Sequence, residues 1–171
     1  MRCAYSENTS FRNANLKNAI FSSGEDLSII ENKPVENQEN DEAEEIDSLE
    51  DKEYFVNTDF SKANLQRADF EGLDLTSVDF ECANLKDVNL KDAILDEANF
   101  FGADLTNANL EGAYLGKADL RNANLQNANL SGSSLKNIKY NRLTLWETAL
   151  GIKNAQDVPS DWLKQLAKMK P

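Results

Sequence analysis

The chain has 171 residues, a formal net charge of −12 and no histidine. This length suits one domain, and the lack of histidine removes the commonest general base and metal ligand. Cys3 and Cys82 are too few for a zinc site or a disulfide framework, so we expect no cofactor and no metal.

No stretch reaches the ~18 consecutive apolar residues of a membrane helix. The first residues also lack the apolar core of a signal peptide. The sequence therefore predicts a cytoplasmic protein without membrane contact.

Residues 1–21 introduce a five-residue pattern. Large apolar residues, here called centres, occur at Phe11, Leu16 and Phe21, and a small residue usually lies two positions earlier. We expect residues 1–21 to form the first part of an N-terminal coil, which Phe55 would complete.

Residues 22–54 interrupt the pattern with thirteen acidic residues against two lysines. This composition favours a solvated, largely disordered insertion. It is a candidate segment for binding a basic protein surface, and its charge would repel nucleic acid. The alternative is a solvated loop without a partner. The candidate interaction residues are Asp41, Glu42, Glu44, Glu45, Asp47, Glu50 and Asp51.

The pattern then runs without a break from Thr58 to Leu135. A period of five fits neither the 3.6-residue helix nor the two-residue strand. It fits very short strands joined by corners, with the centre and the residue two before it pointing inward. Such a chain winds into a solenoid with parallel coils about 4.8 Å apart. The sixteen centres are Phe60, Leu65, Phe70, Leu75, Phe80, Leu85, Leu90, Leu95, Phe100, Leu105, Leu110, Leu115, Leu120, Leu125, Leu130 and Leu135.

The tandem phrases, such as Ala123-Asn124-Leu125 and Ala128-Asn129-Leu130, resemble the pentapeptide-repeat family. The resemblance implies an all-β solenoid, namely a right-handed, four-sided (quadrilateral) parallel β-helix with twenty residues per coil. We place it at residues 55–150. The spacing of Phe60, Phe80 and Phe100 supports the coil length independently. It predicts an aromatic ladder that continues to Phe11.

The corners change along the chain. From residue 100 onward, the second residue after the centre is usually Gly or Asn, as at Gly102 and Asn107. These residues accept the positive φ of a type II turn. We therefore predict type II corners after residue 100 and another geometry before it.

Beyond Leu135 we expect Tyr140 and Leu145 to be centres, with Ile138 and Leu143 as their inward partners. We assign residues 151–171 to a C-terminal cap containing a short α-helix at about 161–169. Its apolar face would comprise Trp162, Leu163, Leu166 and Met169. The alternative is that this face joins two copies, so the protein would be a monomer or a homodimer through its C-terminal end.

The charge is uneven: residues 57–111 carry −8 and residues 112–171 carry +5. A smooth solenoid offers no cleft for catalysis, so we expect a non-enzymatic scaffold for protein–protein interaction. The family resemblance also implies an alternative. Some quinolone-resistance members mimic DNA and bind type II topoisomerases through acidic rods. The candidate acidic face here is Asp69, Asp74, Asp79, Asp87 and Asp92.

Overall fold

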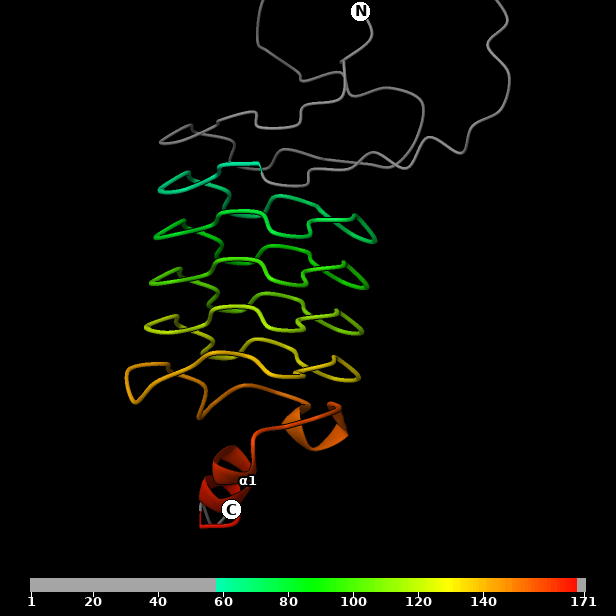
Figure 1. Ribbon diagram of the computed structural model, residues 1–171, viewed down its shortest axis with the longest axis vertical. Helices are drawn as coiled ribbons and strands as arrows, with labels where there is room; N and C mark the ends of the chain where they lie inside the picture. Colours follow the sequence, from blue (N-terminus) through cyan, green and yellow to red (C-terminus); the bar gives the residue numbers. More distant parts are fainter. Residues whose placement is uncertain (1–57, 169–171) are drawn as a thin grey trace, which may run out of the picture.

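The computed structural model describes residues 58–168 (Figure 1). The proposed first coil of residues 1–21, Phe55, the acidic segment 22–54 and Met169 lie outside the described residues. Within the described part, no helix is long and apolar enough to cross a membrane.

The chain winds into stacked coils joined by isolated parallel β-bridges. Most bridges connect residues twenty apart, such as Asp59 with Asp79 and Asn99 with Asp119. The predicted coil length of twenty residues is therefore confirmed. We number the four sides of the coil by their first centres: side 1 contains Phe60, side 2 Leu65, side 3 Phe70 and side 4 Leu75.

The phrase that carries Phe101 illustrates the backbone hydrogen bonding, since each of its five N–H groups has a partner. In residues 98–102, Ala98 N donates to the Leu95 carbonyl across the corner, and Asn99 N donates back to the Val78 carbonyl of the preceding coil. Phe100 N and Gly102 N donate to carbonyls of the following coil, on Asp119 and Arg121. The remaining donor, Phe101 N, bonds to Asn99 Oδ1 at 3.1 Å. Complete pairing of the backbone makes coil stacking favourable.

The interior consists of the centres and the small residues two positions before them. Phe60, Phe80 and Phe100 are fully buried on side 1. Their rings stack with centroid distances of 5.5 Å and 5.1 Å, so this part of the aromatic ladder is confirmed. Alanine fills most of the remaining inward positions, and Leu73, Val78 and Val88 fill three others, so the narrow coil favours small side chains there without excluding larger ones.

The predicted change in corner geometry is wrong. All sixteen corners between residues 60 and 138 have a positive φ at their second residue, including Lys62 (60°), Arg67 (61°) and Glu97 (62°). The turns are therefore of type II throughout. Backbone bonds such as Lys62 N to the Glu81 carbonyl, at 2.8 Å, hold the corners in place whichever residue occupies them.

The register shifts by one residue after Tyr140, which corrects the assignment of Leu145 as a centre. Leu145 pairs with Asn124, twenty-one residues earlier, and is 40% exposed. Trp146 is the buried centre, with Thr144 as its inward partner. The extra residue lies in the corner that follows Tyr140, where Asn141 Oδ1 accepts the Leu143 N–H.

Two short helices lie near the C-terminal end, one before and one after the last bridge, which joins Ser134 and Gln156. The 3₁₀ helix η1 covers Ile152–Asn154, and α1 covers Ser160–Leu166 at the C-terminal end of the rod (Figure 1). The indole of Trp162 is buried and stacks on Trp146 with a centroid distance of 4.5 Å. Leu163, predicted on the same apolar face, is 45% exposed.

Candidate functional site

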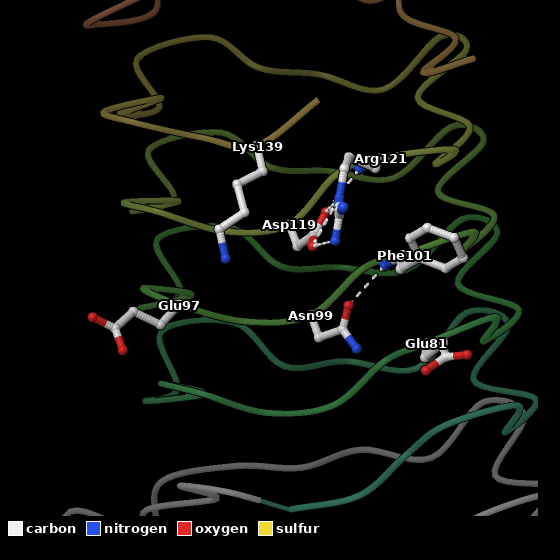
Figure 2. Close-up of a pocket in the computed structure, with 7 residues that line it drawn as sticks. All are labelled: Glu81, Glu97, Asn99, Phe101, Asp119, Arg121 and Lys139. Carbon is white, nitrogen blue, oxygen red and sulfur yellow. Dashed lines mark hydrogen bonds and ion pairs between the residues drawn. The ribbon is translucent and has the colours of Figure 1, made fainter. Parts of the chain in front are cut away.

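A shallow depression of about 370 Å³ lies on side 1 of the rod (Figure 2). The coil register brings its residues together from four successive levels of the rod. Asn99, Asp119 and Lys139 each precede a centre, twenty residues apart. The remaining lining residues are Glu81, Phe101 and Arg121, which each follow a centre, and Glu97 from the adjoining corner.

Arg121 is fixed in place by its neighbours. Its Nε and Nη2 atoms donate to the carboxylate of Asp119, with Nη2 lying 2.6 Å from Oδ2. This hydrogen bonding holds the pKa of the Asp119 carboxyl below its ordinary value. The guanidinium carbon also lies 5.6 Å from the centre of the Phe101 ring, a cation–π distance. Arg121 and Phe101 therefore form one platform on the outer surface.

Lys139 and Glu81 lie near opposite ends of the depression. Within residues 58–168, neither side chain forms an ion pair at 4 Å or less. The neighbouring Glu97 is already paired with Lys117, whose Nζ lies 2.7 Å from Glu97 Oε1. That bond lowers the pKa of Glu97, and the nearby Lys139 contributes to the lowering. Among the residues that line the depression, Lys139 and Glu81 are thus a cation and an anion without an ion pair at 4 Å or less, although Lys139 lies near enough to Glu97 and Asp119 to contribute to their lowered pKa values.

The predicted acidic residues do not gather on one face. Asp69 lies on side 3, Asp74 on side 4 and Asp79 on side 1, because their bridges belong to three different ladders. Their carboxylates accept the backbone N–H groups of Glu71, Thr76 and Glu81 at the corners.

The other two acidic residues, Asp87 and Asp92, occupy the second corner position, where both have a positive φ. Asn107 Nδ2 donates to Asp87 Oδ1 at 2.9 Å, and this bond is the largest cause of a lowered pKa at Asp87. The five carboxylates therefore surround the rod, and those with described bonds serve its own backbone and side chains.

None of the remaining predicted site residues that the structure describes lines the depression. The acidic residues from Asp41 to Asp51 fall outside the described part, as does Met169. Trp162 is buried against the end of the solenoid. Among residues 58–168, no three or more acidic or cysteine side chains gather as a metal site would require.

Sequence reasoning missed the depression because its residues are neighbours only in the coil. One signal was available: Phe101 follows the centre Phe100 and is the only phenylalanine among residues 58–168 at an outward position. Reading the sequence in steps of twenty would have placed Glu81, Phe101 and Arg121 in one column.

The pentapeptide-repeat family model matches residues 54–92 and 98–137, with eight copies. The chain belongs to the pentapeptide-repeat family. A search of curated proteins gives no significant match.

Two solved pentapeptide-repeat proteins share this fold. Rfr23 from the cyanobacterium Cyanothece is 28% identical with a TM-score of 0.62, over 81% of this chain and 88% of its own. A protein of the Arabidopsis thaliana thylakoid lumen is 27% identical with a TM-score of 0.51, over 53% of this chain and 63% of its own. Pentapeptide-repeat structures of this kind imply a right-handed quadrilateral β-helix.

Proposed function

We propose that this pentapeptide-repeat protein is a non-enzymatic scaffold that binds other proteins. The observation that carries the proposal is the platform of Phe101 and Arg121 on side 1. Aromatic residues and arginine are the side chains that most often dominate the energy of protein interfaces. Here both are held on the outside of a rod.

Rigidity of the rod supports this proposal. The phrase that carries Phe101 has all five backbone N–H groups bonded, three of them to adjacent coils. A partner would therefore meet a preformed surface, and binding would require little ordering of the scaffold.

We assign α1 as the C-terminal cap. Trp162 stacks on Trp146 and contacts the ring of Tyr140 edge-on at 5.4 Å, so it covers apolar surface at the end of the last coil. Leu163 on α1 is 45% exposed and Leu150, before η1, is 58% exposed, which leaves apolar surface for a homodimer through this end. Light scattering of the purified chain, compared with a Leu163→Asp variant, separates a monomer from such a dimer.

Mimicry of DNA has less support. A mimic presents phosphate-like charge along one continuous track. The candidate carboxylates instead lie around the rod, and Asp87 and Asp104 are within 4 Å of the cationic groups of Arg67 and Lys86.

The acidic segment 22–54 remains a second proposed contact, directed at basic protein surfaces. The test is capture of partners from a native lysate by the full chain, by a variant lacking residues 23–53, and by a Phe101→Ala variant. We expect the deletion variant to keep the circular dichroism spectrum of the rod. Loss of a partner from one variant alone assigns that partner to the altered surface. Failure of the full chain to retain any partner would contradict the scaffold function.

A further inference from the structure

The depression on side 1 has Lys139 and Glu81 near its two ends. The platform of Phe101 and Arg121 lies at the coil levels between them. We propose that this depression binds an extended segment of a partner protein. That segment presents an acidic side chain to Lys139, an apolar side chain to Phe101 and a basic side chain to Glu81. The inference rests on the proposed scaffold function and specifies the sequence that a partner would carry.

The spacing of the coils sets the spacing of the ligand. Bridges connect Asp79 with Asn99, Asn99 with Asp119, and Asp119 with Lys139, so Lys139 lies three coil steps beyond the level of Glu81. With about 4.8 Å per step, this separation is about 14 Å along the rod. An extended chain rises about 3.4 Å per residue and therefore covers the same length in about four residues.

Side-chain direction fixes the rest of the pattern. In an extended segment, alternate residues point to the same face. Residues one, three and five of a five-residue stretch would therefore face the rod together. The expected ligand is acidic–any–apolar–any–basic. The reverse order fits equally well with the segment running in the opposite direction, because the contacts involve side chains.

The existing ion pairs explain why Lys139 is the cation that an incoming carboxylate would meet. Arg121 is engaged with Asp119, and Lys117 is engaged with Glu97.

Three synthetic peptides of matched length test the inference against the full chain labelled with ¹⁵N. The first has aspartate, leucine and lysine at alternate positions separated by serine. The second has the same composition, but its charges are three residues apart and thus point to opposite faces. The third replaces the lysine with aspartate. We expect the first peptide to shift the amide resonances of Phe101, Arg121 and Lys139.

The matched peptides should bind about threefold to fivefold more weakly, since an exposed ion pair contributes up to about that factor. Equal binding of all three peptides, or shifts located elsewhere on the rod, would overturn the inference.

Charge variants provide the second arm. Lys139→Glu and Glu81→Lys should each weaken the first peptide by about threefold to fivefold or more. The double variant should restore binding, because the peptide can reverse its direction. Lys136→Glu, on side 4, is the matched control and should have no effect. Failure of the double variant to restore binding would contradict the proposed pairing.

The lysate experiment keeps the two proposals distinguishable. A partner retained by the full chain and equally by Phe101→Ala and Lys139→Glu would leave the scaffold function standing and remove side 1 from it. Peptide binding as expected, with no partner retained from lysate, would support the chemistry of side 1 and remove the scaffold function.

Discussion

At the scale of single residues, asparagine and aspartate before the centres serve the backbone. Asn124 Oδ1 accepts the Gln126 N–H at 3.1 Å, and its Nδ2 donates to Thr106 Oγ1 at 3.0 Å in the preceding coil. Asn124→Ala should lower the free energy of unfolding by about 1–2 kcal/mol, because one backbone donor loses its acceptor. Urea denaturation measures the change. Ser134→Ala, at the equivalent position of side 4, is the control and should cost less.

The corner residues predict a stabilising substitution. Ser77 has a φ of 58°, a conformation that costs a residue with a Cβ about 1 kcal/mol and costs glycine little. Ser77→Gly should therefore raise the free energy of unfolding by up to about 1 kcal/mol. Ser131→Gly makes the same chemical change at a first corner position, outside the positive-φ set, and should destabilise. Equal effects of the two substitutions in denaturation would contradict this account.

The sequence predicted inward and outward positions well but failed at the corners. The five-residue period itself identifies centres such as Leu105, because only one assignment of inward positions within the phrase buries the large apolar residues. Corner geometry was inferred from the preferences of Gly and Asn. At Lys62 and Glu97, hydrogen bonds to the next coil override those preferences, and local sequence does not reveal that constraint.

At the scale of one coil, packing of the interior places large side chains at the centres and small ones at most partner positions. Leu105 is fully buried, and Ala103 beside it is 1% exposed. Leu105→Ala should cost about 2–5 kcal/mol of unfolding free energy through the cavity that it leaves. Ala103→Leu should cost about 1–3 kcal/mol through overpacking. The double variant, which conserves volume within the coil, tests the account by denaturation. It should recover part of the combined loss.

The last coil departs from the five-residue period. Leu145 lies five residues after Tyr140, where the five-residue period predicts a centre, yet Trp146 occupies the interior. Thr144 Oγ1 donates to the Leu120 carbonyl at 2.8 Å, and Asn141 Nδ2 donates to Asn122 Oδ1 at the same distance. These bonds accommodate one added residue in the corner. The larger indole then fills the interior, which the five-residue period alone could not predict.

The helix α1 yields a prediction at the same scale. Trp162→Ala removes the ring that stacks on Trp146, so α1 should detach from the rod. Near-ultraviolet circular dichroism should lose the signal of the paired indoles, and the unfolding free energy should fall by a few kcal/mol, at most about 5. Trp162→Phe keeps an aromatic ring and should cost less. An unchanged near-ultraviolet spectrum in Trp162→Ala would contradict the assignment of α1 as a cap.

At the scale of the whole molecule, the candidate surface depends on the coil length more than on any motif. Charge summed along the sequence suggested an acidic face, but residues five apart lie on successive sides of the rod. Asp69, Asp74 and Asp79 are therefore separated. By contrast, one column on side 1 is formed by Glu81, Phe101 and Arg121, which follow one another at intervals of twenty residues. Only the period of twenty connects them, and outward side chains carry no periodic signal that would mark them.

Stability of the whole rod should decline at both extremes of pH. Hydrogen bonds from Arg121 lower the pKa of Asp119 below 3.8, so its contribution is present above about pH 4 and is lost as the pH falls through the folded-state pKa. Hydrogen bonding to Asp161 raises the pKa of Tyr140 to about 12. Its contribution is present below about pH 10, the ordinary tyrosine pKa, and is lost as the pH rises towards 12.

Two variants separate the loss of stability at acid pH (the acid limb) from the loss at alkaline pH (the alkaline limb) when thermal unfolding is measured across the pH range. Asp119→Asn should reduce the acid limb and leave the alkaline limb unchanged. Tyr140→Phe keeps the ring that contacts Trp162 but removes the titrating hydroxyl, so it should reduce the alkaline limb alone. Because Asp161 belongs to α1, the alkaline limb also reports whether the helix and the last coil unfold together. An alkaline limb that persists unchanged in Tyr140→Phe would show that this contact does not couple them.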